Sequence, residues 1–416
     1  MGVMGGSPQT GVNERATYAS LLRTRGVSAL FGISLTTVIA TSLQILALSV
    51  AVFQQTGSAL WSTIAFAAGF LPQLVGGTLL TSLADRWPPR ALLASGSVAR
   101  AASAFVIAFG GLPPAASIAV VAVVAVWQPV PMAAQSTLLT RLVTGERYVL
   151  GRSVLGLISS GAQLLGLAAG GAAVQLLGAT AAFAVAGLVS LLGLLPLLAI
   201  PRTSGAPGTA HRWRPAETWV GNGRLLRDPA VRRILVAWWL GPALLVGAEA
   251  LVVPYVGEQR TAGMPAGLLL AAFPAGAAVG DLVVGRFLPD EVRRRSVPWL
   301  FALVGAPLLP LAWHPGLAVA WTCFALASVG MAYQLGGQQA FLAAVPETQR
   351  GLAFGLFSTG LMGGQGVGPV IAGIFADHIG AGLTMTALGL AILVAAARFG
   401  SVPAPRVEPP AAGAQT

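Results

Sequence analysis

The fold of this chain is decided by residues 201–233, PRTSGAPGTAHRWRPAETWVGNGRLLRDPAVRR, the longest polar stretch between its two ends. Seven of the 24 arginines lie in this stretch: Arg202, Arg212, Arg214, Arg224, Arg227, Arg232 and Arg233. On each side lies an almost wholly apolar block, long enough for six membrane spans of about 20 residues each. The pattern predicts two six-helix halves joined by a cytoplasmic hinge-loop.

The composition supports an integral membrane protein. Hydrophobic residues make up 55% of the 416 residues and charged residues only 9%, against about 25% charged in a soluble domain. The absence of lysine argues against a P-loop ATPase, and the single cysteine, Cys323, argues against a disulfide framework or a thiol metal cluster. No metal-ligand or nucleophile–base set falls in the spans, so neither a metal, a cofactor nor an enzymatic activity is expected.

The hydropathy pattern predicts an all-α protein with 12 transmembrane helices. Eleven expected spans are 27–53, 59–83, 117–142, 154–177, 179–200, 234–256, 265–288, 297–313, 316–345, 352–376 and 381–399, and the third ends at Leu112. The expected domains are an N-tail (1–26), an N-terminal half (27–200), the hinge-loop (201–233), a C-terminal half (234–399) and a C-tail (400–416).

The arginines predict the orientation of these spans. Of the 24, 22 fall in the two tails, the hinge-loop and the loops on the same side of the membrane. Arg260 lies in an opposite loop and Arg100 within a span. By the positive-inside rule both termini are cytoplasmic, and the expected location is a bacterial plasma membrane. The net charge of +11 then indicates contact with the lipid bilayer rather than with nucleic acid.

The two halves repeat at a shift of 202 residues. Gly166 corresponds to Gly368, Gly171 to Gly373, and Gly178 to Gly380, with no gap across two pairs of spans. Six spans repeated in one orientation predict two parallel halves with a substrate site between them, near the middle of the membrane.

Three motifs carry a resemblance to a known family. Residues 83–90, LADRWPPR, are similar to the loop motif Gly-x-x-x-Asp-Arg-x-Gly-Arg-Arg of the major facilitator superfamily. They keep the acid and two of the arginines, but Thr81, Pro88 and Pro89 depart from the motif. Residues 166–171, GLAAGG, and 364–373, GQGVGPVIAG, resemble its antiporter signature Gly-Pro-x-x-Gly-Gly. From residue 26 to 399 the chain most resembles the branch of enterobactin exporters, macrolide-efflux proteins and other drug:proton antiporters.

The resemblance implies roles for these motifs. Asp85, Arg86 and Arg90 would form a conformational latch, in which the acid caps the start of the eleventh helix in the outward-open state. The alternative is a plain cluster of loop charges. Small residues allow close helix packing and bending, and this role is expected for Gly166, Gly170, Gly171, Gly364, Gly368, Pro369 and Gly373. The arginine that many antiporters carry in the fourth helix is absent, so the resemblance does not supply their usual proton-coupling residue.

Glu249 is the candidate proton- or substrate-binding acid. It lies 16 residues after Arg233, about 24 Å along a helix, on one face with Trp238, Pro242 and Leu245. A carboxylate in a partly dry cavity has a raised proton affinity, so this acid would exchange a proton or bind a cationic substrate. A structural ion pair, or a position near the outer interface, is the alternative.

Uncharged polar residues fall on single faces of three other spans that, in the family, line the cavity. These candidate ligands are Thr41 and Gln44 in the first span, Gln128 and Gln135 in the fourth, and Gln334 and Gln338 in the tenth. Hydrogen bonds between helices are the alternative interpretation. Arg100 is expected to extend toward the cytoplasmic surface, and Asp377 to be solvated in an outer loop.

The sequence therefore predicts a secondary transporter that exports a small amphipathic molecule, such as a drug, siderophore or secondary metabolite. Proton antiport would drive the export, and alternating access would be its mechanism. The transporter would use no nucleotide and would be a monomer. Multidrug resistance and siderophore export are the processes it would serve. Two alternatives stay open: a proton-coupled importer of a small nutrient, and a membrane sensor or assembly protein that transports nothing.

Overall fold

In the computed structural model every regular element of the described residues is a helix; these residues are 21, 24–80, 83, 87–143, 146–200, 215–259, 266–346 and 349–399. The N-terminal half comprises α2 (Arg25–Thr56), α3 (Ala59–Ala67), α4 (Leu71–Leu79), α5 (Pro89–Phe109), α6 (Pro114–Trp127), α7 (Pro129–Leu142), α8 (Glu146–Leu192) and the 3-10 helix η2 (Pro196–Ala199). The C-terminal half comprises α10 (Pro229–Ala250), α11 (Val252–Glu258), α12 (Ala266–Phe287), α13 (Asp290–Gly305), η3 (Ala306–Trp313), α14 (Leu317–Gly330), α15 (Tyr333–Ala344), α16 (Arg350–Ile379) and α17 (Ala381–Phe399).

Twelve spans in two six-helix halves are confirmed. Ten stretches of the described residues are long and apolar enough to cross a membrane, and one of them, Leu150–Ala199, contains two helices. These two helices turn at Gly178, whose backbone has φ 82° and ψ 167°. The 30-residue helix α16 completes the set. Part of the expected hinge-loop forms a further helix, α9 (Pro215–Arg227), and its residues 201–214 lie outside the described part of the chain.

The repeat is visible in the backbone as well as in the sequence. Gly380, which is 202 residues after Gly178, has φ 87° and ψ 157° and joins α16 to α17 in the same way. This region of backbone space is open to glycine and strained for other residues. A glycine at the same point of each half therefore turns the chain directly from one span into the next.

Several predicted spans are not continuous helices. The second span, expected over 59–83, is broken between α3 and α4, and the fourth is broken at Pro129 between α6 and α7. Proline has no backbone N–H and cannot complete the helical ladder, which accounts for the break at Pro129 and for the new start at Pro72. Each break lies inside a single apolar stretch long enough to cross a membrane, Ala59–Leu79 and Pro114–Leu142.

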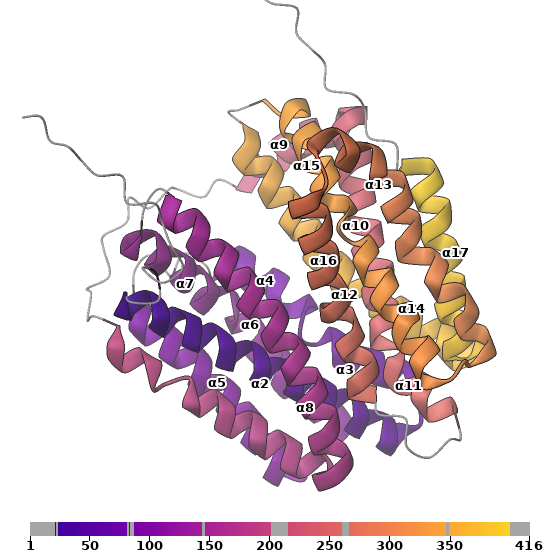
Figure 1. The fold of residues 1–416 in the computed structure, drawn as a ribbon. Helices are drawn as coiled ribbons and strands as arrows, with labels where there is room; N and C mark the ends of the chain where they lie inside the picture. The colour runs from indigo at the N-terminus through magenta and orange to yellow at the C-terminus, as the bar shows by residue number, and fades with distance from the viewer. Residues whose placement is uncertain are drawn as a thin grey trace, which may run out of the picture.

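The two halves are inclined to each other. Figure 1 shows them meeting around α3, α8 and α11 and diverging toward α7 and α9. We call the end where α3 begins and α16 finishes the closed end, and the end where α7 finishes and α16 begins the open end. The termini of the described chain, at residues 21 and 399, both lie toward the open end.

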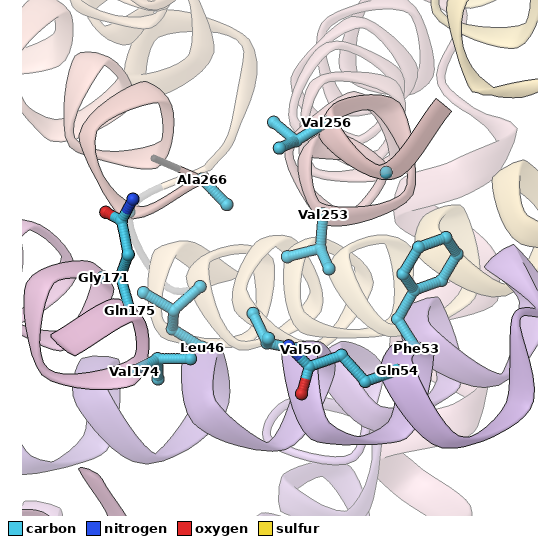
Figure 2. A pocket seen from close by; sticks show the side chains of 12 residues that line it. Leu46, Val50, Phe53, Gln54, Gly171, Val174, Gln175, Val253, Val256 and Ala266 are labelled. Atoms are coloured by element: carbon cyan, nitrogen blue, oxygen red, sulfur yellow. The ribbon is translucent and has the colours of Figure 1, made fainter. Parts of the chain in front are cut away.

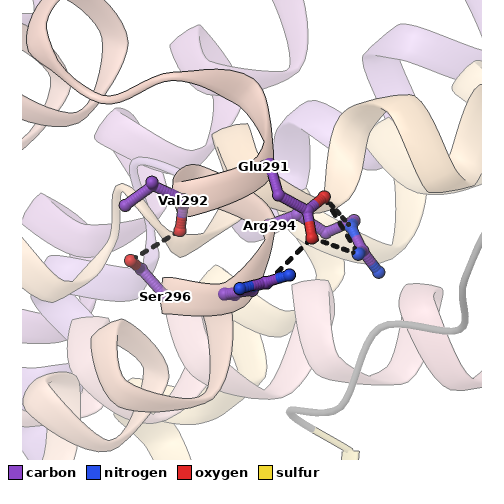
Figure 3. A network of polar contacts seen from close by, with 5 residues as sticks. Glu291, Val292, Arg294 and Ser296 are labelled. Carbon is purple, nitrogen blue, oxygen red and sulfur yellow. Dashed lines mark hydrogen bonds and ion pairs between the residues drawn. The ribbon is translucent and has the colours of Figure 1, made fainter.

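Charged residues at the start of α13 illustrate the surface at the open end. Glu291 accepts hydrogen bonds from Arg294 and from Arg295, each with a shortest distance of 2.8 Å (Figure 3). Ser296 Oγ donates to the Val292 carbonyl at 2.8 Å. Exposed pairs of this kind contribute little stability, but an acid in the first turn complements the helix dipole and supports this helix start.

Candidate functional site: the interface between the halves

Asp377, at the C-terminal end of α16, joins the two halves at the closed end. Its carboxylate accepts three hydrogen bonds from the start of α3: from Ser58 Oγ at 2.8 Å, from Ala59 N at 2.7 Å and from Leu60 N at 3.2 Å. This acid is exposed, as expected, but the expectation of an outer loop is wrong, because it lies in the last turn of α16. A helix N-terminus has unpaired N–H groups and a partial positive charge, and both stabilise a carboxylate.

Two glycines bring the halves into backbone contact at this end. A Cβ on Gly373 of α16 would lie 2.8 Å from Leu60 Cα and still closer to Thr63 Oγ1. A Cβ on Gly171 of α8 would lie 2.6 Å from Gly267 Cα in α12. Since Gly171 and Gly373 are equivalent in the repeat, the α3–α16 seam and the α8–α12 seam are built to one plan.

The other predicted packing residues lie inside single halves. Gly166 and Gly170 face α2, at Ile39 and Leu43, whereas Gly364 and Gly368 face Ala243 of α10. Pro369 lies in the middle of α16. Close packing is therefore observed at these glycines, while a role in bending stays a prediction.

A cavity of about 340 Å³ lies between the halves on the side of the seams toward the open end. It is lined by α4, α7 and α16, through Gln73, Leu74, Gly77, Thr78, Pro129, Met132, Gly355, Ser358, Thr359 and Met362. No charged side chain is among these residues. We call it the inter-half cavity; its two methionines and three hydroxyl groups provide a soft, weakly polar surface.

A second cavity, of about 590 Å³, lies at the closed end between α2, α8, α11 and α12 (Figure 2). Its lining is mostly aliphatic, and its only polar side chains are the amides Gln54 and Gln175. Gly171 and Gly267 of the α8–α12 seam also line it, so the seam forms part of its wall.

Glu249 lies within the C-terminal half rather than on either cavity. Its side chain is 9% exposed, and no described residue gives it a hydrogen bond or an ion pair. On the same face of α10, Trp238 contacts the rings of Phe341 and Phe357, each at a centroid distance of 5.1 Å. Burying an ionisable carboxyl group in a membrane span costs free energy, and such residues are commonly functional.

The remaining predicted ligands are spread over separate places. Gln44 donates to Ser103 Oγ at 2.9 Å inside the N-terminal half, and Thr41 Oγ1 donates to the Thr37 carbonyl at 2.8 Å. In α15, Gln334 Nε2 is buried without a hydrogen-bond partner, and Gln338 is exposed. The structure does not bring these residues to one cavity, and their roles stay predictions.

Gln128 and Gln135, by contrast, meet in one small pocket. It has a volume of about 30 Å³ and lies between α2, α5 and the α6–α7 junction; its polar lining residues are Thr37, Ser97, Arg100, Gln128 and Gln135. Arg100 is 3% exposed, so the expectation that it extends to the membrane surface is wrong. It lies on a buried face of α5 and lines this pocket instead. Helical spacing placed Gln128 and Gln135 on one face, but it gave no signal that Arg100 lines the same pocket.

The predicted latch is only partly within the described residues. Asp85 and Arg86 lie outside them, and Arg90 Nη1 donates to the Ile200 carbonyl at 3.5 Å. The latch therefore stays a prediction. Among the described residues, no three His, Cys, Asp or Glu side chains are grouped as they would be around a metal ion.

Comparison with known proteins shows the family. The model of the Major Facilitator Superfamily matches residues 30–344 and 251–416. A POT family transporter in complex with a thioalcohol conjugated peptide superimposes with a TM-score of 0.69 at 12% identity, over 90% of this chain and 95% of the other. A mutant of peptide transporter POT in complex with sulfate gives a TM-score of 0.66 at 14% identity, over 91% and 95%. The sequence matches no curated protein. This chain belongs to the major facilitator superfamily, a family of transporters.

Proposed function

We propose that this member of the superfamily exports a small amphipathic molecule in exchange for protons, by alternating access. The exported molecule would be a drug, a siderophore or a secondary metabolite. The narrower exporter branch is proposed from the motifs in residues 83–90, 166–171 and 364–373.

One observation carries the proposal: the halves are joined at one end, and a cavity lies between them on the other side of the joint. Alternating access requires such a state and a second one with the opposite end joined. The arginine distribution assigns the open end to the cytoplasm. The structure would then be the inward-facing state, ready to receive a molecule from the cell.

The lining of the inter-half cavity supports an amphipathic substrate. Its polar groups are hydroxyls and the Gln73 amide, and its apolar groups include Met132 and Met362. Methionine adapts its shape to different ligands and is frequent at binding surfaces that accept several of them. A volume of about 340 Å³ is in the range of sites for small molecules.

Glu249 is the proposed proton carrier. It is buried in α10, and no described cation neutralises it. A charged carboxylate is costly in a buried, apolar position. Binding of a proton would therefore stabilise the arrangement of helices that buries Glu249, and release of the proton would destabilise it. Such a group provides a means of coupling a proton gradient to the movement of one half against the other.

The test is accumulation of a lipophilic fluorescent dye in efflux-deficient bacteria, with and without a protonophore. Cells would carry empty vector, the wild-type protein, Glu249→Gln, or Asp281→Asn as a control that removes an exposed acid from α12. We expect wild type and Asp281→Asn to lower accumulation several-fold. Protonophore and Glu249→Gln are each expected to abolish this effect.

The outcomes separate the alternatives. Higher dye accumulation with wild type than with vector would favour import, which reconstituted vesicles with imposed gradients of either sign would then measure. An effect that survives both the protonophore and Glu249→Gln would contradict proton exchange through this residue. No effect of wild type on a panel of dyes and siderophores would favour a role without transport.

A further inference from the structure

Arg100 is the buried charge for which the proposed function has no use. It lies in α5, 3% exposed, and no described acid or hydrogen-bond acceptor binds its guanidinium. A guanidinium buried in this way is costly unless something neutralises it. A buried arginine in a membrane span is therefore expected to bind a negatively charged or hydrogen-bond-accepting group.

The groups around Arg100 do not supply this negative charge. The other polar residues of the pocket, Thr37, Ser97, Gln128 and Gln135, are all neutral. Polar groups nearby are already bound to each other: Ser103 Oγ donates to the Arg100 carbonyl at 2.8 Å, and Gln44 binds Ser103. The pocket thus presents one unneutralised cation flanked by amides and hydroxyls that donate hydrogen bonds. This is the composition of a site for an oxyanion.

The size and place of the pocket limit what it holds. Its volume of about 30 Å³ fits roughly two water molecules, and therefore one carboxylate-sized group but not a whole ligand. Met132, which is 52% exposed, lines both this pocket and the inter-half cavity, and Gln128 is followed directly by Pro129 of that cavity. A molecule in the larger cavity would be able to place one end in the pocket.

We propose that Arg100, with Gln128 and Gln135, binds a single carboxylate or similar oxyanion of the transported molecule, whose apolar body occupies the inter-half cavity. The substrate class is then an amphipathic organic acid. The inference deepens the proposed transport, but it requires neither export nor proton exchange, so binding by purified protein tests it separately.

The experiment measures the melting temperature of purified protein in phosphatidylcholine nanodiscs. The added ligands are sodium benzoate and, as its uncharged counterpart, benzamide, each at constant chloride concentration. The proteins are wild type, Arg100→Gln, Gln128→Leu and, as a control from the exposed face of α12, Arg286→Gln. We expect benzoate to raise the melting temperature of wild type and Arg286→Gln by several degrees. Apparent affinity should fall at least tenfold in Arg100→Gln and less in Gln128→Leu, and benzamide should have no effect on any of them.

Stability without ligand gives a second readout. Because the proposal leaves Arg100 unneutralised in the free protein, Arg100→Gln should melt at a higher temperature than wild type before benzoate is added. A variant that melts lower, or does not fold, would show that the guanidinium has a structural role and overturn the proposal.

Other sources of the anion give different results. Equal benzoate shifts in wild type and Arg100→Gln, or no shift in either, would overturn the proposal. If sulfate replaces benzoate fully at the same concentration, the site is for free inorganic anions and not for an organic acid. A wild-type shift caused only by adding phosphatidylglycerol to the nanodiscs would identify a lipid headgroup site instead.

Discussion

The two seams at the closed end share a glycine contact and differ in one polar contact. Each brings a glycine of one half against the backbone of the other, Gly373 against Leu60 and Gly171 against Gly267. In the α3–α16 seam, Asp377 adds three hydrogen bonds to the start of α3. The equivalent position in the α8–α12 seam, 202 residues earlier, is Gln175, which has no hydrogen bond to a described residue.

The comparison separates two contributions to closure. Close packing is common to both seams, and it depends on the absence of a side chain at Gly171, Gly267 and Gly373. The charge–dipole contact is present in one seam only. If the halves separate at this end during transport, the α3–α16 seam must lose polar contacts, whereas the α8–α12 seam loses mainly apolar ones. Variants at these positions measure the two contributions separately.

Blocking the glycine contact should have the largest effect. In Gly171→Leu, the new side chain would meet the Gly267 backbone, and backbone cannot move aside as a flexible side chain does. Overpacking typically costs about 1–3 kcal/mol. We expect the closed end to open in most molecules. The readout is the distance distribution between spin labels on Leu177→Cys and Leu383→Cys in a Cys323→Ala background.

The matched control for this variant lies on the same helix. A Cβ on Gly156 of α8 would meet no other atom within 4 Å. Gly156→Leu should therefore leave the label distances unchanged. If Gly171→Leu gives the same distances as this control, the α8–α12 contact does not hold the end closed.

Removing the carboxylate should have a smaller effect. Asp377→Ala leaves the N–H groups of Ala59 and Leu60 without their partner, and loss of such a cap costs about 0.5–2 kcal/mol. We expect the open fraction at this end to rise roughly 2- to 30-fold, measured with the same labels. Gln175→Ala serves as the equivalent change in the other seam. A similar rise in that variant would contradict the distinction between the seams.

Adding a carboxylate to the second seam should have the smallest effect, of opposite sign. Gln175 and Ala266, the first residue of α12, line the same cavity (Figure 2). Gln175→Asp would bring a negative charge near that helix start, a contribution of about 0.3–1 kcal/mol. The open fraction should fall about 2- to 5-fold, and the gain should weaken at high salt. A gain insensitive to salt would indicate a cause other than charge.

The sequence determined the membrane class, the two halves and the repeat. These follow from long apolar runs, from the placement of the arginines and from glycines such as Gly178 and Gly380, because hydropathy and backbone freedom are properties of local sequence. The breaks near Pro72 and Pro129 fall at prolines, which lack a backbone N–H. A proline alone does not locate a break, however, because Pro369 lies inside the continuous helix α16.

Only the tertiary structure decided which polar residues meet. The sequence predicted that Gln44 and Gln128 both line the substrate cavity. In the structure Gln44 donates a hydrogen bond to Ser103, whereas Gln128 lines a separate small pocket with Arg100. Asp377 finds its partner 319 residues away at Ser58. Periodicity says which residues share a face of one helix. The rotation and tilt of that helix, set by packing against all the others, decide what the face meets.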